Sequence, residues 1–131
     1  VYYCAPEVLI GQLSTPLSDI YSMGIVFYEI LVGKVPFDGN NPEEIAIKQI
    51  KNHLPEPSLA LSSVPRALDK IIIKACRKRK EERFQSSKEM HDAILEAMKN
   101  GKKFKERKGF FSNEFARFFL SERQPFFIIG R

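Results

Sequence analysis

The chain has 131 residues, 44% of them hydrophobic and 28% charged, which is enough apolar side chain for one modest core. Its net charge of +5 is uneven, because residues 1–73 carry a net −3 and residues 74–131 a net +8. No apolar run reaches the roughly 18 residues of a membrane helix, and Cys4 and Cys76 lack the spacing of a zinc site or a disulfide framework. We therefore expect one globular unit with a basic tail, no membrane span in this chain, and reduced thiols in the cytoplasm.

Two helices are predicted in the first third of the chain. The first is a short helix that opens with Pro6 and Glu7, residue types suited to a first helical turn, and ends near Gly11. The second spans residues 19–31 and is apolar almost all round, with Ser18 as the expected N-cap and Gly33 as the expected stop. Such a helix belongs in the middle of a domain, and the rest of this chain is expected to cover only part of it.

A third helix is predicted for residues 41–52, where Asn41 is the cap, Pro42 lies in the first turn and Glu44 follows three residues after the cap. Residues 54–63 contain two prolines and three serines and are predicted to be a loop. Pro65 then begins a fourth helix with a single apolar stripe, which consists of Leu68, Ile71, Ile72 and Ala75.

The last predicted core helix begins at a capping box formed by Ser86 and Glu89 and is stopped by Gly101. Its apolar face consists of Met90, Ile94, Leu95 and Met98. No alternating strand pattern precedes the tail, so the fold class is all-α with about five helices. Residues 1–100 form the predicted domain, and residues 101–131 form a basic linker and a Phe-rich tail.

The basic residues of the second half gather in two dense runs, residues 77–80 and 102–108. A basic run can serve nucleic acid or anionic lipid, but these two are interpreted as a solvated loop and a linker, since no nucleic-acid module accompanies them. Residues 110–120 have helix-like spacing. This segment either folds back on the domain or forms a membrane-surface or partner-binding helix, although Glu114 and Glu122 dilute its basic face.

Four segments, in their order and spacing, resemble the C-terminal lobe of the protein kinase catalytic domain. They are Tyr3-Cys4-Ala5-Pro6-Glu7, Ser18-Asp19-Ile20-Tyr21-Ser22-Met23-Gly24, Gly33-Lys34-Val35-Pro36-Phe37 and Arg83-Phe84-Gln85-Ser86. Ala-Pro-Glu alone is a weak signal. Four ordered matches over about 90 residues are a strong one, and they cover residues 1–100.

The resemblance is closest to the Ser/Thr branch, and within it to bacterial members of the eukaryotic-type kinases. Tyr3 stands where tyrosine kinases usually carry tryptophan. One departure is visible, because such sequences usually have Lys-Asp-Pro where this chain has Lys78-Arg79-Lys80. The loop before Arg83 is therefore expected to continue as helix, with Arg83 itself in place.

The resemblance implies structural roles for three charged residues. Glu7 and Arg83 resemble the buried ion pair that ties the end of the activation segment to the lobe. Asp19 resembles the aspartate whose carboxylate accepts N–H bonds from the catalytic loop, a role that its place at a helix start suits. Outside the pattern of motifs, Glu7 would be an ordinary helix-start charge and Asp19 an ordinary cap.

The resemblance also implies a substrate-docking loop formed by Val1, Tyr2, Tyr3 and Cys4, which receives the residue after the phosphoacceptor. Standing alone, Tyr3 would be a core aromatic. No residue of this chain is assigned a catalytic, cofactor or metal role.

Phosphoryl transfer needs a Gly-rich loop, a strand lysine, a catalytic-loop aspartate with its asparagine, and a metal-binding aspartate before Phe-Gly. None is found, because the seven glycines never fall in a GxGxxG spacing and neither His53 nor His91 begins His-Arg-Asp. The chain is therefore expected to begin inside the activation segment and to be inactive alone. ATP and Mg²⁺ are expected only for a full-length parent kinase.

Two hypotheses of function remain open. In the first, the chain docks a protein substrate for a Ser/Thr kinase. In the second, it is a non-catalytic interaction module that binds a partner through the helix at residues 41–52. For either, self-association through exposed apolar surface is expected.

The end of the chain, Pro125-Phe126-Phe127-Ile128-Ile129-Gly130-Arg131, resembles the first strand and Gly-Arg of a forkhead-associated domain. The alternative is a frayed tail, because a lone strand has no partner to pair with.

Overall fold

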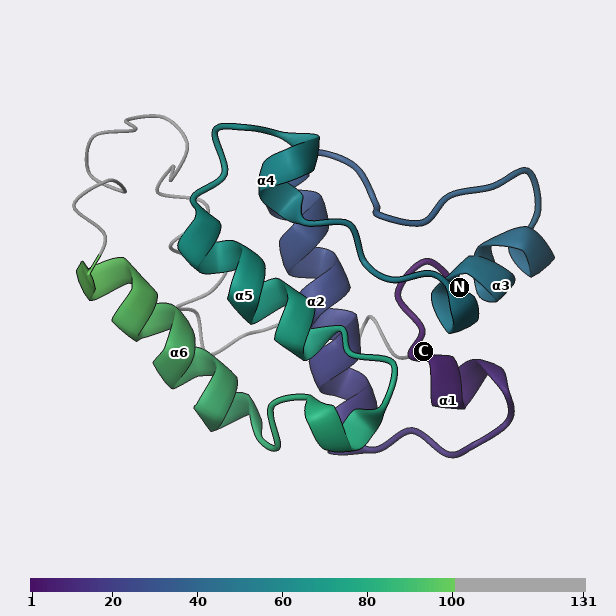
Figure 1. Cartoon of the computed structure of the whole chain (residues 1–131). Coiled ribbons are helices and arrows are strands. Elements are labelled where there is room, and N and C mark those ends of the chain that lie inside the picture. Colours follow the sequence, from purple (N-terminus) through teal and green to yellow (C-terminus); the bar gives the residue numbers. More distant parts are fainter. Residues whose placement is uncertain (101–131) are drawn as a thin grey trace.

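The computed structural model describes residues 1–100, and within that range it contains six α-helices, one 3₁₀-helix and no strand (Figure 1). The all-α prediction is confirmed, with one helix more than expected. The elements are α1 (Pro6–Leu9), α2 (Pro16–Val32), α3 (Pro42–Lys51), α4 (Pro57–Ala60), α5 (Arg66–Ala75), η1 (Lys80–Glu82) and α6 (Ser87–Asn100). The predictions for Gly101, the basic linker, the Phe-rich helix and the final strand lie outside the described residues.

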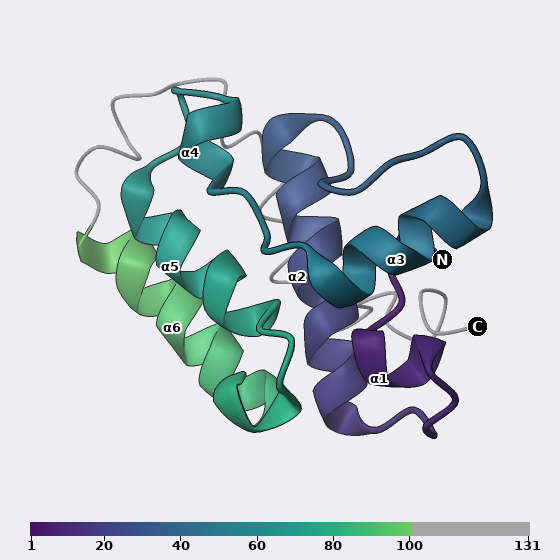
Figure 2. The same ribbon diagram turned by 45° about the vertical axis from the view of Figure 1, so that its right-hand side comes forward.

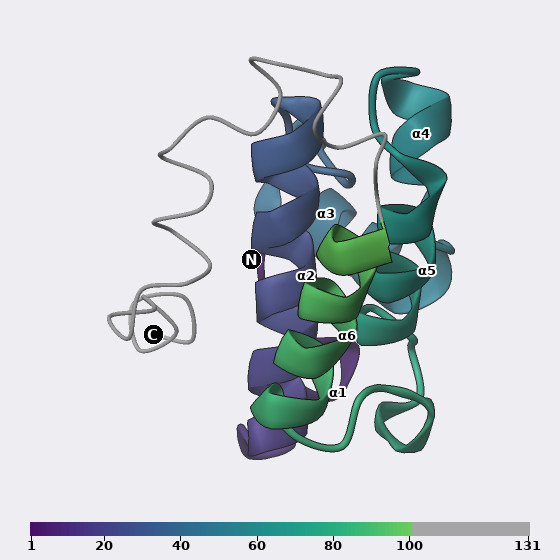
Figure 3. The ribbon, with the colours of Figure 1, turned by 90° about the vertical axis from the view of Figure 1, so that its left-hand side faces the viewer.

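Helix α2 runs through the middle of the molecule, with α5 and α6 on one side and α1 and α3 on the other (Figures 1 and 2). Helix α6 packs against both α5 and α2, and it lies in front of them in Figure 3. These three helices enclose the main apolar core, whose most deeply buried members are Ile20, Phe27, Tyr28, Val64, Leu68, Ile72, Ala75 and Met90. Burial of this apolar surface is the principal stabilising term of the fold.

Helix α2 starts three residues earlier than predicted, and its N-cap is Thr15, not Ser18. Pro16 occupies the first helical position, which suits proline because that position needs no N–H donor. The Thr15 hydroxyl accepts a bond from the Ser18 N–H at 3.4 Å, and the Ser18 hydroxyl accepts one from the Thr15 N–H at 3.1 Å. At the other end Gly33 is the C-cap as predicted, with a left-handed φ of 92°.

The close approach of α2 to the end of α5 depends on Gly24. A Cβ atom at that position would lie 2.5 Å from Cys76 Sγ and 2.9 Å from Ala75 Cβ. Any larger residue would therefore push the two helices apart.

The predicted starts of α3 and α6 are confirmed, with a shared variation. Asn41 accepts a bond from the Glu44 N–H at 2.8 Å, and Ser86 accepts one from the Glu89 N–H at 3.1 Å. In neither case does the glutamate carboxylate accept a bond from the N–H of the cap residue itself, as it would in a capping box. Its carboxylate instead accepts a bond from the N–H one residue earlier, at Asn40 or at Gln85.

Two loop predictions need correction. Residues 54–63 are not wholly loop, because they contain α4, which Asp69 of α5 fastens by accepting bonds from the N–H and the hydroxyl of Ser58. The segment before Arg83 does not continue α5 as helix. Helix α5 ends at Ala75, and only the three residues of η1 are helical before Arg83.

Helix α3 has a thin buried face, formed by Ile45 and Gln49. It packs near α1 and the N-terminal residues (Figure 2). Among residues 1–100, no helix is long and apolar enough to cross a membrane.

Candidate functional site

The loop of residues 1–4, the predicted substrate-docking loop, is held mainly through its backbone. The Gln49 side-chain amide donates to the Tyr2 carbonyl at 2.5 Å and lies 3.4 Å from the Val1 carbonyl. Ser22 on α2 donates its hydroxyl to the Tyr3 carbonyl at 2.7 Å. Because these bonds are made to carbonyl groups, they fix the path of the loop and leave its side chains available for other contacts.

The tyrosine side chains of this loop meet acidic residues. The Tyr3 hydroxyl donates to Glu29 of α2 at 2.7 Å, and this hydrogen bond, together with burial, raises the pKa of Tyr3 to about 12. The exposed Tyr2 hydroxyl donates to Asp38 at 3.2 Å, and the charge of that aspartate raises the pKa of Tyr2. Both tyrosines therefore stay protonated at neutral pH.

Glu7 and Arg83, which the sequence pairs across 76 positions, meet in the interior. The Arg83 Nη1 atom lies 2.7 Å from Glu7 Oε2, and Nη2 lies 2.7 Å from Oε1, so the contact is bidentate. Ser18 adds a hydroxyl donor to Glu7 at 3.2 Å. Burial opposes ionisation of Glu7, but the hydrogen bonds and the charge of Arg83 outweigh it and lower the pKa of Glu7.

The remaining donors of Arg83 bind backbone carbonyls of two other segments. They reach the carbonyl of Leu17 at 2.9 Å, that of Arg77 at 2.7 Å and that of Lys78 at 3.1 Å. A single guanidinium thus joins α1, the start of α2 and the loop after α5. Its rigid fork of donors allows several fixed directions of bonding at once, which a lysine cannot match.

Asp19 lies exposed in the first turn of α2. Its carboxylate makes no hydrogen bond or ion pair with any residue in the range 1–100. The supporting role that the resemblance implies for it stays a prediction.

A second polar cluster, not anticipated from the sequence, is formed by Tyr21, Gln49 and Lys78. The buried Tyr21 hydroxyl donates to the Gln49 side-chain oxygen, while the Lys78 ammonium donates to the Gln49 carbonyl at 2.6 Å and to the Tyr21 hydroxyl at 3.3 Å. We call these three residues the polar hub. It links α2, α3 and the loop after α5 to the carbonyls of residues 1 and 2.

The sequence carries a faint signal for the polar hub. Gln49 lies four residues after Ile45, and thus on the buried face of α3, where a polar side chain needs a partner. Tyr21 lies within a helix that is apolar almost all round, where its hydroxyl has the same need. What the sequence did not indicate is that the two side chains satisfy each other.

Side chains of the metal-ligating types are dispersed over the described part of the chain. No three His, Cys, Asp or Glu side chains come together within residues 1–100. Cys4 is half-buried and Cys76 is buried, and both are free thiols. The contacts described above fix the positions of backbone segments.

The family model for the protein kinase domain matches residues 1–95. The chain therefore belongs to the protein kinase domain family, which the order of the helices and the ion pair had indicated.

Curated relatives of the chain include bacterial proteins named as Ser/Thr protein kinases. The chain is 38% identical over 97 residues to the serine/threonine-protein kinase PrkC of Bacillus subtilis, covering 74% of this chain and 15% of that protein. It is 38% identical over 90 residues to the probable kinase PknB of Lactococcus lactis, covering 69% and 14%. It is 35% identical over 99 residues to PknB of Mycobacterium tuberculosis, covering 76% and 16%. The chain thus spans only about 15% of the length of these relatives.

Proposed function

We propose that residues 1–100 form the substrate-docking part of a Ser/Thr protein kinase catalytic domain, which transfers the γ-phosphate of ATP to Ser or Thr hydroxyls of proteins. The observation that carries the proposal is the backbone anchoring of residues 1–4 by Gln49 and Ser22, with the Tyr2 side chain left exposed. A loop fixed in this way is preorganised, so an arriving peptide would lose less binding energy in ordering it. The names of the relatives support the same class of enzyme.

In this proposal the ion pair of Glu7 and Arg83 fixes the helix that follows the docking loop. Glu7 lies in α1, directly after residues 1–4, and Arg83 connects it to the loop after α5. Asp19 would support a catalytic loop by accepting backbone N–H bonds. The free thiols of Cys4 and Cys76 suit the reducing cytoplasm.

ATP and Mg²⁺, which a kinase of this kind uses, do not fit the residues of this chain. The chain has no GxGxxG spacing, and its described part has no cluster of metal-ligating side chains. We therefore derive no step of phosphoryl transfer through these residues, and we expect the 131-residue chain to be inactive alone. Incubation with radiolabelled ATP, Mg²⁺ and a generic basic protein should leave that protein unlabelled. Any labelling above that of a heat-denatured control would contradict the expected inactivity.

The docking role is tested by NMR titration of the isotope-labelled 131-residue chain with a serine-containing peptide. Chemical shifts should move at residues 1–4, and Gln49→Leu should reduce these shifts because the loop loses its carbonyl anchor. Gln85→Leu is the matched control, since the Gln85 side chain binds only carbonyls of its own segment. Shifts that avoid residues 1–4, or that Gln49→Leu leaves unchanged, would refute docking at this loop.

A second candidate function, a non-catalytic interaction module, has one observation in its favour. Ile47 on the outer face of α3 is 53% exposed, which leaves an apolar side chain open to a partner or to a second copy of the chain. Sedimentation of the chain should then show association that Ile47→Glu removes. The control is Leu13→Glu, which alters an exposed leucine in the loop after α1 and should leave association intact. A wild-type chain that sediments as a monomer would refute self-association through Ile47.

A further inference from the structure

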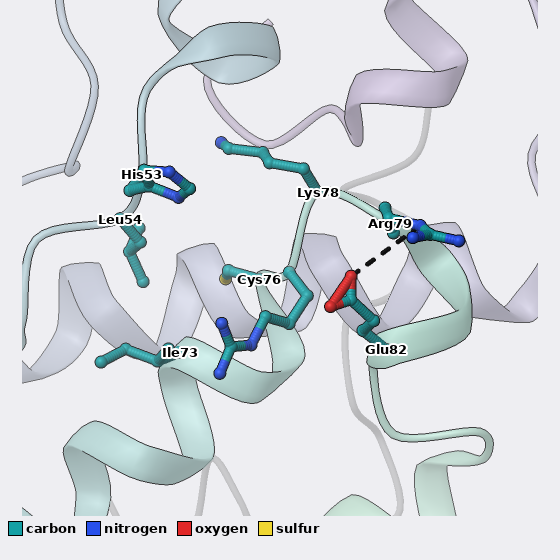
Figure 4. A pocket seen from close by; sticks show the side chains of 8 residues that line it. His53, Leu54, Ile73, Cys76, Lys78, Arg79 and Glu82 are labelled. Atoms are coloured by element: carbon teal, nitrogen blue, oxygen red, sulfur yellow. Dashed lines mark ion pairs between the residues drawn. The ribbon is translucent and has the colours of Figure 1, made fainter.

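A pocket of about 410 Å³ lies between the segment after α3 and the loop after α5, apart from residues 1–4. Figure 4 shows His53 and Leu54 on one side of it and Cys76 and Lys78 on the other. Neither the ion pair of Glu7 and Arg83 nor the docking loop uses this pocket. Its volume falls within the range of pockets that bind small molecules or single side chains.

The lining of the pocket is strongly basic. Three consecutive cationic residues, Arg77, Lys78 and Arg79, line it together with His53, and the single acidic lining residue is Glu82. The Glu82 carboxylate lies 3.9 Å from the Arg79 Nε atom, and both side chains are largely exposed. This ion pair therefore neutralises little of the positive charge of the pocket. The exposed guanidinium of Arg77 makes no ion pair or hydrogen bond with any residue of the described range.

Lys78 adds a second positive charge that no carboxylate balances. Its ammonium group donates to the Gln49 carbonyl and the Tyr21 hydroxyl, which are neutral acceptors. Burial, with a smaller effect of the Arg83 charge, lowers the pKa of Lys78 to about 8. The side chain therefore still carries its charge at neutral pH, and an anion in the pocket would stabilise that charge.

The inner wall of the pocket is apolar. Leu54 and Ile73 line it as half-buried side chains, and Cys76 lines it as a buried one. A ligand that combines an anionic group with a neighbouring apolar group fits this arrangement, because the cations lie beside an apolar surface.

We propose that this pocket binds a phosphorylated Ser or Thr side chain of a partner peptide, with an apolar residue of that peptide against Leu54 and Ile73. The phosphate carries close to two negative charges at neutral pH and thus matches the charges of Arg77 and Lys78, whereas a carboxylate carries one. The planar guanidinium of Arg77 can bind two phosphate oxygens at once. The inference goes beyond the docking of an unmodified substrate at residues 1–4 and does not depend on it.

The test uses the 131-residue chain and a fluorescent seven-residue peptide with a central phosphoserine beside a leucine. Fluorescence anisotropy should show saturable binding of this peptide and none of its unphosphorylated form. Arg77→Ala should weaken binding by about tenfold or more, because it removes charged hydrogen bonds. The affinity of Arg77→Lys for the peptide should lie between those of the wild type and Arg77→Ala, since lysine keeps the positive charge but lacks the planar guanidinium. Arg66→Ala is the matched control, because Arg66 is equally an exposed arginine but lies at the start of α5, outside the pocket.

Several results would overturn the proposal. Equal binding of a short single-stranded oligonucleotide would indicate a general basic surface, and competition by free phosphate at the same concentration as the phosphopeptide would indicate a simple ion site. Equal losses for Arg77→Ala and Arg66→Ala would indicate non-specific attraction. NMR shifts of the chain on addition of the phosphopeptide should centre on His53, Leu54 and residues 73–79, and shifts centred elsewhere would place the peptide outside the pocket.

Discussion

The two sides of α2 are packed by different interactions. Toward α5 and α6 the contacts are apolar, and Phe27, Leu68 and Ile72 are completely buried there. Toward α1, α3 and the N-terminal loop there is only a small apolar cluster, formed by Ala5, Tyr21, Ile25 and Cys76, and it is supplemented by hydrogen bonds and one ion pair. Apolar burial is non-directional and contributes most of the stability, whereas hydrogen bonds need fixed geometry. The apolar side therefore holds the domain together, and the polar side sets where the candidate docking loop lies.

The largest effect is expected at the ion pair, because it joins the two regions. Glu7→Ala and Arg83→Ala should each lower the free energy of unfolding by about 3 to 5 kcal/mol, since each leaves a buried charge without its partner. Arg83→Lys should also destabilise, because lysine cannot make the bidentate contact or the three carbonyl bonds. Urea unfolding of the 131-residue chain measures these losses.

The double variant of Glu7 and Arg83 sharpens this test. Both single changes break the same contact, so the double variant should lose much less than the sum of the two single losses. Losses that add to within about 0.5 kcal/mol would show that the two side chains act independently.

A change on the apolar side should lower the stability of the whole domain and should not affect one segment more than the others. Leu68→Ala removes a fully buried side chain and should cost about 2 to 5 kcal/mol in thermal or urea unfolding. Hydrogen exchange should then accelerate throughout α2, α5 and α6 together. Leu59→Ala in α4 is the matched control, because Leu59 is 79% exposed and should change stability by no more than about 0.5 kcal/mol.

A change on the polar side should act locally. Tyr21→Phe removes the hydroxyl that Gln49 and Lys78 share, at a cost of about 1 to 3 kcal/mol for the partners left unsatisfied. Hydrogen exchange should accelerate in α3 and residues 1–5 more than in α5 or α6. Tyr28→Phe provides the comparison, since the Tyr28 hydroxyl bonds to no residue in the described part of the chain. An equal response to both substitutions would mean that the polar hub does not position the loop.

The smallest effect concerns pH and Lys78. The folded chain lowers the pKa of this lysine from 10.5 to about 8, so between these pH values the unfolded chain binds a proton that the folded chain has released. The contribution of Lys78 to stability therefore rises as pH increases from 8. Solvent screening of this half-buried group keeps the rise between pH 8 and pH 9 below about 1 kcal/mol.

The measurement is the difference in unfolding free energy between the wild type and Lys78→Met at pH 8 and pH 9. Burial raises the pKa of the Cys76 thiol from 9.0 to about 12, which opposes the trend above pH 9, but both proteins carry this cysteine. A difference that falls with pH would show that the lysine pKa is not lowered.

Sequence patterns predicted the helices best where a local rule applies. Asn41 and Gly33 mark helix ends through contacts with their own neighbours, and both predictions are confirmed. The errors arose where tertiary contacts decide. Helix α4 is only four residues long and is fastened by Asp69, which is 11 positions from Ser58. The start of α2 was misplaced because Thr15 and Ser18 are both good cap residues, and Pro16 at the first helical position favours Thr15.

The candidate site divides in the same way. Glu7 and Arg83 were paired because each lies in a recognisable motif, and the structure brings them together. The polar hub has no motif, since Tyr21, Gln49 and Lys78 come from three separate segments. Their meeting depends on how α2, α3 and the loop after α5 pack, which local sequence does not encode.

The separation of Glu7 and Arg83 along the chain also bears on the kinetics of folding. Closing a loop of 76 residues costs conformational entropy before the ion pair repays it, whereas α2, α5 and α6 gain apolar burial as soon as they meet. The pair is thus expected to form after the rate-limiting step, so its loss should speed unfolding and leave the folding rate nearly unchanged in stopped-flow experiments. The ion pair would then determine how long the folded state lasts, and not how quickly it is reached.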